Sequence, residues 1–135
     1  MPSFLVQFSA ASKQAVESGH AEVFSELMDC ADPPVVGTRR LVDHQFSALE
    51  EEALEPLMEA VAALGAKAGE IDAVEVPGDA GLVLTVFSFR AEDPVLLDAN
   101  FMTARVLEMM AAAESKDAQY DGWWVSYEPR VINTD

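Results

Sequence analysis

The sequence predicts an α+β fold: a ferredoxin-like βαββαβ sandwich with a four-stranded antiparallel sheet and an additional N-terminal helix. Helical and strand-like patterns follow one another in the order helix, strand, helix, strand, strand, helix, strand. The chain has 135 residues, 50% of them hydrophobic, which suits one domain with one core. It contains no internal repeat, linker or low-complexity segment. We therefore expect a single domain over residues 1–135, with its core at about 35–128.

The first two elements are a helix and a strand. Apolar residues at near-helical spacing predict a helix over about 11–29, which Asp32, Pro33 and Pro34 end. We expect His20 on the exposed side of this helix. Residues 35–46 alternate β-branched with polar side chains and predict the first strand. The apolar stripe of the helix is Val16, Val23, Leu27 and Cys30.

The second helix has the strongest local signals. Ser47 and Glu50 have the spacing of a capping box, so we expect the helix to begin there. Gly65 suits its C-terminal cap. The predicted inner face is Leu54, Leu57, Met58, Val61 and Leu64, and the outer face carries Glu50, Glu51, Glu55 and Glu59.

A hairpin, a third helix and a last strand follow. Residues 67–76 and 82–90 predict two strands joined by the turn at 77–81. Because residues 82–89 are apolar on both faces, we expect the third strand to lie centrally and to be covered on both sides. Asp93 and Pro94 predict a helix start, and residues 116–128 predict the fourth strand. The expected apolar stripe of the third helix is Leu97, Phe101, Ala104, Leu107 and Ala111.

The charge of the chain is strongly negative, with 24 acidic against 8 basic residues and a formal net charge of −16. A field of that sign repels phosphate backbones, so we expect no direct nucleic-acid binding. It favours a basic partner, although the same charge could serve solubility alone.

Few residues suit catalysis or metal binding. Cys30 is the single cysteine, which excludes an internal disulfide and fits a reducing cytoplasm. Asp43 and His44 are adjacent, so on a strand they point to opposite faces and do not pair with each other. The glycines match no nucleotide-binding loop. We therefore expect no enzyme activity, no cofactor, no metal, no membrane span and no secretory signal at residues 4–8.

An aromatic run at residues 120–124 holds both tryptophans. Gly122 predicts a β-bulge or a close backbone approach. Alternation places Trp123 and Trp124 on opposite faces of the last strand. We expect one of them to be buried, whereas the other either packs in the core or contacts a partner at the open face of the sheet.

The Tyr-Asp-Gly-Trp motif at 120–123, after a helix rich in Leu, Met and Ala, resembles the RraB family of regulators of ribonuclease E activity. The segment at 43–47 with the Glu-rich helix that follows it, and the segment at 96–100, resemble the same family. The resemblance covers about residues 22–128. The best-known members carry glycine where this chain has Trp124, and they have a long acidic C-terminal tail.

The resemblance implies a cytoplasmic protein that inhibits the endoribonuclease by binding its noncatalytic scaffold region, without being an enzyme. The acidic composition agrees with a basic protein segment as the partner. The alternative is a small-molecule-binding or sensory ferredoxin-like module, and either could be a homodimer. The candidate partner-binding residues are Trp123, Trp124, Glu51, Glu52, Glu55 and Glu59.

Overall fold

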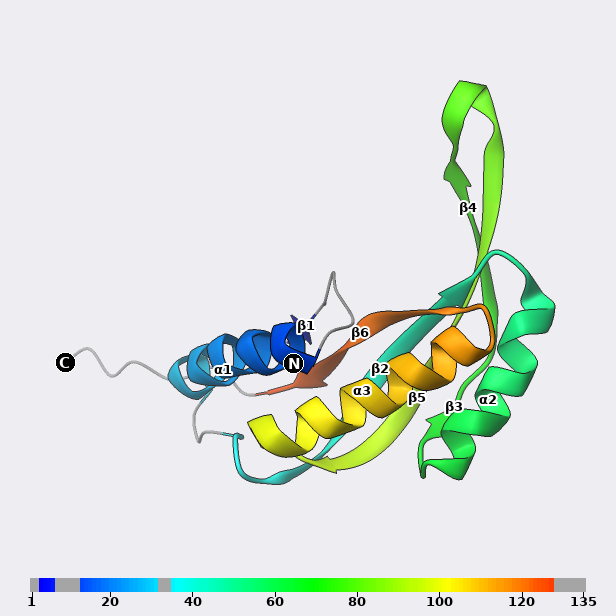
Figure 1. Ribbon diagram of the computed structural model, residues 1–135. Coiled ribbons are helices and arrows are strands. Elements are labelled where there is room, and N and C mark those ends of the chain that lie inside the picture. The colour runs from blue at the N-terminus through cyan, green and yellow to red at the C-terminus, as the bar shows by residue number, and fades with distance from the viewer. Residues whose placement is uncertain (1–2, 7–12, 32–34, 128–135) are drawn as a thin grey trace.

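The computed structural model describes residues 3–6, 13–31 and 35–127, and these residues form an α+β fold of three helices and an antiparallel sheet, as predicted (Figure 1). The expected helix stop at 32–34 and the last residues of the chain lie outside the described residues. The helices are α1 (Lys13–Cys30), α2 (Leu54–Ala63) and α3 (Ala99–Ser115), with short 3-10 turns η1 (Glu51–Ala53) and η2 (Asp79–Gly81). The strands are β1 (Ser3–Val6), β2 (Arg39–Ala48), β3 (Lys67–Ala68), β4 (Asp72–Pro77), β5 (Val83–Leu96) and β6 (Gln119–Ser126).

The sheet is larger than the four strands predicted. Its order is β1-β6-β2-β5-β3. β4 also pairs with β5, along the same edge as β3. The predicted second strand is therefore two strands, which are separated around Gly69, where the amide donates to the Arg90 carbonyl at 2.7 Å. β1 adds a further edge strand by pairing with β6.

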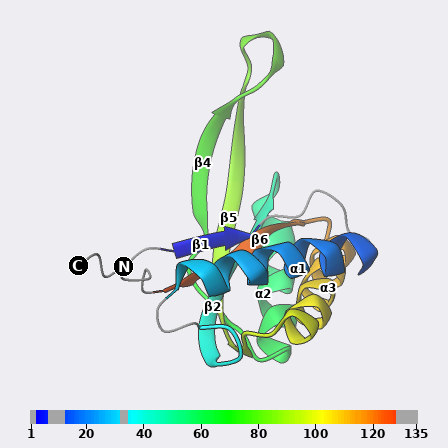
Figure 2. The same ribbon diagram turned by 90° about the vertical axis from the view of Figure 1, so that its left-hand side faces the viewer.

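The helices cover one face of the sheet, and the other face carries no described helix (Figures 1 and 2). α1 packs beside α3, and α2 lies at the far edge against β3 and β5. The helix-covered face buries alternate strand residues, among them Phe46 and Phe89, whose rings stack at 5.1 Å between centroids. The first helix thus adds to the helical layer and leaves the second sheet face open.

Only part of the apolar third strand is covered. β5 is central where it lies between β2 and β3, as expected, but its first residues form with β4 a two-stranded arm that projects from the body (Figure 1). Leu82 is 66% exposed and Val83 is 63% exposed. The expectation that both faces of this strand are covered is wrong for the arm.

The predicted start of the second helix is also wrong. Ser47 belongs to β2, where it pairs with Ser88 of β5 and with Gln119 of β6. Glu50 precedes η1 and makes no side-chain capping hydrogen bond. Strand pairing on both sides of Ser47 outweighs the single capping hydrogen bond that the local sequence offers.

The predicted start of the third helix fails for a related reason. Asp93 and Pro94 lie inside β5, and the cap of α3 is Asp98, whose carboxylate accepts the Phe101 amide at 3.0 Å. Pro94 is tolerated because β3 begins at Lys67, opposite Glu92, so no described strand lies beside Pro94 on that side of β5. With the later start, the buried face of α3 is Met102, Thr103, Val106, Met109 and Ala113. Phe101, Ala104 and Ala111 of the predicted stripe are exposed.

Gly65 ends α2 as predicted. Its φ is +103°, its amide donates to Ala62 at 3.0 Å, and the Ala66 amide donates to Val61 at 3.1 Å. This is the Schellman arrangement, in which a left-handed residue closes the helix.

We expect Gly65→Ala to lower the free energy of unfolding by about 1 kcal/mol, because an L side chain is strained at this φ. Urea denaturation measures the change. The control is Gly69→Ala, where φ is not left-handed and an added Cβ would lie 3.4 Å from the Arg90 carbonyl. Equal effects of the two substitutions would contradict the cap as the cause.

Candidate functional site

The Tyr-Asp-Gly-Trp motif forms a β-bulge, as Gly122 predicts. Opposite Gln45 and Phe46 the register shifts, so that Asp121 is the additional residue on β6. Gly122 has a φ of +132°, which favours glycine. The bulge sets the faces of the residues around it, with Tyr120 and Trp123 both buried on the helix side.

Trp123 is fully buried and joins β6 to α1. Its indole N–H donates to His20 Nε2 at 3.2 Å, and its ring lies 6.0 Å from that of Phe24. Because Nε2 accepts, the neutral His20 ring carries its proton on Nδ1, which donates to Thr103 Oγ1 at 2.9 Å. The expectation that His20 is exposed is wrong, and Trp123 is not accessible to a partner in this structure.

His20 is held neutral by its surroundings. Burial lowers its pKa from 6.5 to about 4, because the charged ring would lose its hydration. Protonation at Nε2 would also remove the acceptor of the Trp123 N–H. The contact between α1, α3 and β6 therefore requires a neutral His20.

His44 lies in a second buried network. The Tyr120 hydroxyl lies 2.7 Å from His44 Nδ1, and His44 Nε2 lies 2.9 Å from Asp93 Oδ2. Arg105 Nε lies 3.0 Å from the same carboxylate oxygen. These residue types could support acid–base chemistry, but His44 and Asp93 are both 0% exposed. A dissolved substrate cannot reach them, so we interpret the network as structural.

Asp93 and Arg105 are the residues that sequence reasoning missed. Asp93 resembled a helix cap because it precedes a proline, and Arg105 carried no signal of its own. The spacing of 12 residues between them has no local meaning, and only the packing of α3 on β5 joins them. The sequence did contain a signal for the correct start of the third helix: Asp98 is a second capping residue, and it lies closer to the helical pattern than Asp93.

Trp124 faces the open side of the sheet. It pairs with Asp43 of β2, with which it shares a side-chain hydrogen bond, and the Arg90 guanidinium lies 4.3 Å from its ring centroid. This is cation–π geometry. Asp43 lies on the opposite face from His44, as strand alternation predicts.

A shallow groove of 290 Å³ lies beside Trp124. Its lining is Asp43, Lys67, Ala68, Gly69, Arg90 and Glu92. Burial and then the neighbouring Glu92 raise the pKa of Asp43, whereas Arg90 and the Trp124 hydrogen bond oppose this change. Small-molecule sites are mostly apolar. A lining with four charged side chains fits the alternative of a small-molecule-binding module poorly.

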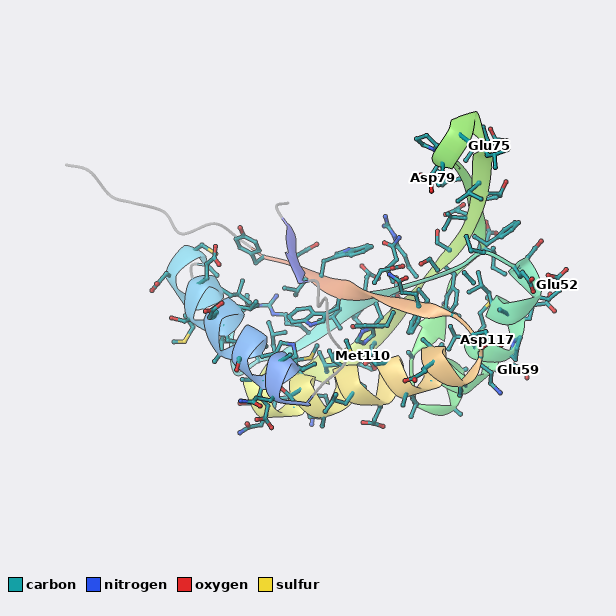
Figure 3. The ribbon with its side chains drawn as sticks, turned by 45° about the horizontal axis from the view of Figure 1, so that its top comes forward. Glu52, Glu59, Glu75, Asp79, Met110 and Asp117 are labelled. Carbon is teal, nitrogen blue, oxygen red and sulfur yellow. The ribbon has the colours of Figure 1, made fainter. Side chains whose placement is uncertain are left out.

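The glutamates of the second helix form a separate surface. Glu51, Glu52, Glu55 and Glu59 are all exposed, and Figure 3 shows Glu52 and Glu59 pointing away from the body. α2 lies on the helix-covered face, next to β3. Trp124 lies on the open face, next to β1. The structure therefore does not bring Trp124 and these glutamates together.

The described part of the chain contains neither a metal-binding cluster nor a membrane-spanning helix. Among residues 3–6, 13–31 and 35–127, no group of three or more His, Cys, Asp or Glu side chains is placed to hold a metal ion. Within the same residues, no helix is long and apolar enough to cross a membrane.

These features define a small acidic α+β protein with exposed glutamates on η1 and α2 and with the charged pair Asp93 and Arg105 inside. The chain belongs to the regulator of ribonuclease activity B (RraB) family, whose model matches residues 35–125. That range begins before β2 and ends within β6, so it contains the bulge, the arm and α2. The predicted resemblance to this family is confirmed.

Two curated relatives show the degree of similarity. The regulator of ribonuclease activity B of Salmonella typhi is 32% identical over 108 residues, covering 78% of this chain and 72% of that protein. The protein of the same name from Escherichia coli (strain K12) is 31% identical over the same length and coverage.

Proposed function

We propose that this protein regulates RNA decay without catalysis, by binding a basic segment of a ribonuclease. The observation that carries the proposal is the set of exposed glutamates at 51, 52, 55 and 59 on η1 and α2, in a member of the RraB family. We call this set the acidic ridge. No lysine, arginine or histidine lies between residues 45 and 66. The ridge therefore presents one sign of charge to a partner.

The proposed partner is a basic, noncatalytic scaffold region of ribonuclease E. Its positive charge would be attracted by the net charge of −16, which speeds association and sets orientation. The same charge disfavours direct contact with nucleic acid. A cytoplasmic location fits this partner and the single cysteine.

Trp124 is a second proposed contact. Arginine and lysine side chains stack on tryptophan, and Arg90 already occupies this position at 4.3 Å. A partner arginine could replace Arg90 there while Asp43 continues to hold the indole N–H. Such a contact suits the proposed ferredoxin-like arrangement, in which both helices of the βαββαβ unit lie on one face of the sheet and leave the other face open.

Binding to the ribonuclease E scaffold segment should be measured by calorimetry at about 0.1 M and about 1 M salt. The Debye length falls from roughly 10 Å to roughly 3 Å between these conditions, so the affinity should fall if charges on the ridge carry the contact. Absence of binding at the lower salt concentration would overturn the proposed function.

A matched pair of variants locates the contact. Glu52, Glu55 and Glu59 are changed together to glutamine, and the control changes Glu22, Glu26 and Asp29 of α1 to their amides. Both variants lose three negative charges, but α1 and α2 lie at opposite ends of the molecule (Figure 1). We expect only the α2 variant to lose both affinity and salt dependence. Equal losses would show that net charge, and not the ridge, attracts the partner.

A further inference from the structure

The arm formed by β4 and the first part of β5 has an unpaired strand edge. β2 ends at Ala48, which pairs with Phe87, so no described strand lies beside β5 on that side between Val83 and Val86. The Gly78 amide donates to the Leu82 carbonyl, and the Gly69 amide donates to the Arg90 carbonyl, each at 2.7 Å. Even-numbered residues of β5 therefore point their main-chain groups toward β4 and β3. By alternation, the main-chain N–H and C=O groups of Val83 and Thr85 point toward the free edge.

The two edges of the arm differ in their protection. On β4 the same alternation turns Ala73, Glu75 and Pro77 outward. A proline offers no N–H, and a charged residue discourages further pairing, so this edge is blocked in the usual way. The β5 edge has neither, because residues 82–89 contain no proline and no charged side chain. The β5 edge is the one open to another strand.

A groove lies where this edge meets the body. It has a volume of 450 Å³ and brings together Val86 of the arm, Leu49 beyond the end of β2, and Asp117 before β6. Its other lining residues are Ser47, Ala48, Ala118 and Gln119. Leu49 is 66% exposed and Leu84 is 46% exposed. A strand continuing the line of β2 along β5 would place alternate side chains against this apolar surface.

The charge around the edge selects the occupant. Residues 69–89 carry Glu70, Asp72, Glu75 and Asp79 and no lysine, arginine or histidine. Figure 3 shows Glu75 and Asp79 near the tip of the arm. A second copy of the arm would bring like charges together, whereas a basic extended segment would be attracted.

We propose that the free edge at Val83–Val86 binds an extended segment of a partner protein by β-strand addition, the segment having alternating apolar and basic residues. This inference rests on the proposed function and identifies where and how the basic segment would dock. Main-chain hydrogen bonds to Val83 and Thr85 supply the pairing, and the groove at Leu49 and Val86 receives apolar side chains. The edge spans only about 13 Å, so the groove and the surrounding charge must supplement the ladder.

The test compares Thr85→Pro with Thr85→Val, using calorimetry with the ribonuclease E scaffold segment. Proline removes the outward amide of residue 85 without removing a hydrogen bond to β4, whereas valine keeps the amide and a similar volume. We expect Thr85→Pro to weaken binding about tenfold or more, and Thr85→Val to leave it within about twofold. Circular dichroism and thermal unfolding check that both variants fold alike.

Hydrogen exchange gives an independent result. On binding, the amides of Val83 and Thr85 in the wild-type protein should become protected, because they gain partners. Equal affinities of the two variants, or protection confined to other segments, would overturn strand addition while leaving the proposed function intact. Failure of the wild-type protein to bind would overturn both. Concentration-dependent dimerisation that Thr85→Pro abolishes would assign the edge to a second copy and overturn the basic partner.

Discussion

Arg105→Met is expected to lower the free energy of unfolding by about 3–5 kcal/mol, because it leaves the Asp93 carboxylate buried without its cation. Asp93 is 0% exposed, and Arg105 Nε lies 3.0 Å from its Oδ2. Methionine retains most of the apolar stem of the arginine, so lost packing contributes little. Urea denaturation, with the slope checked for two-state behaviour, measures the change.

The control is a double-mutant cycle with Asp93→Asn. If the unpaired charge is the cause, the double variant should be much less destabilised than the sum of the two single variants, since asparagine needs no counter-charge. Arg105→Lys should fall between the wild type and Arg105→Met, because it keeps the charge but not the guanidinium geometry. A cost below about 1 kcal/mol for Arg105→Met, together with additive single effects, would show that the pair does not hold α3 on β5.

Acidification is expected to weaken the fold through His20. Its pKa in the folded protein is about 4, against 6.5 for the ordinary side chain, so the unfolded chain binds the proton more tightly. The contribution of the neutral ring is therefore complete above about pH 6.5 and is lost as the pH falls toward 4. The shift corresponds to about 3 kcal/mol across this window.

His20→Gln isolates this effect, because an amide can also accept from Trp123 and donate to Thr103, and it does not titrate. Unfolding free energies of the wild type and the variant should be compared at several pH values between 7.5 and 4. Subtracting the two unfolding free energies at each pH removes the contributions of Asp43 and Asp121, which both proteins share. The pKa values of these carboxyls are raised, so their protonation favours the folded state as the pH falls. We expect the wild type to lose about 3 kcal/mol relative to His20→Gln. Parallel pH profiles would mean that His20 protonation does not oppose folding.

Comparison of particular elements shows which features were predictable from the sequence. The α1 helix, the Gly65 cap, the Gly122 bulge and the opposite faces of Trp123 and Trp124 follow from local periodicity and backbone conformation. Such features depend on neighbours within a few residues. The family resemblance rests on the same short patterns and is confirmed over residues 35–125.

The errors have one common cause. Ser47 and Asp93 both have the local pattern of a helix cap, yet both lie in strands, where they meet partners that are distant in the sequence. His20 looked exposed because a helix pattern does not show that Trp123, 103 residues away, supplies a hydrogen bond. A local helix cap stabilises the fold by about 1 kcal/mol. Burying and pairing a charged group changes the free energy of folding by several kcal/mol.

For the candidate surfaces, the sequence by itself determined the chemistry: a net charge of −16, a glutamate row on one helix and a tryptophan on each face of the last strand. Only the tertiary structure decided their accessibility. It buries Trp123 against α1, leaves Trp124 beside Arg90, and extends an apolar, uncovered edge at Val83–Val86 beyond the end of β2. The physical reason is that composition and periodicity are local properties, whereas burial and unpaired edges depend on which distant segments end and which continue.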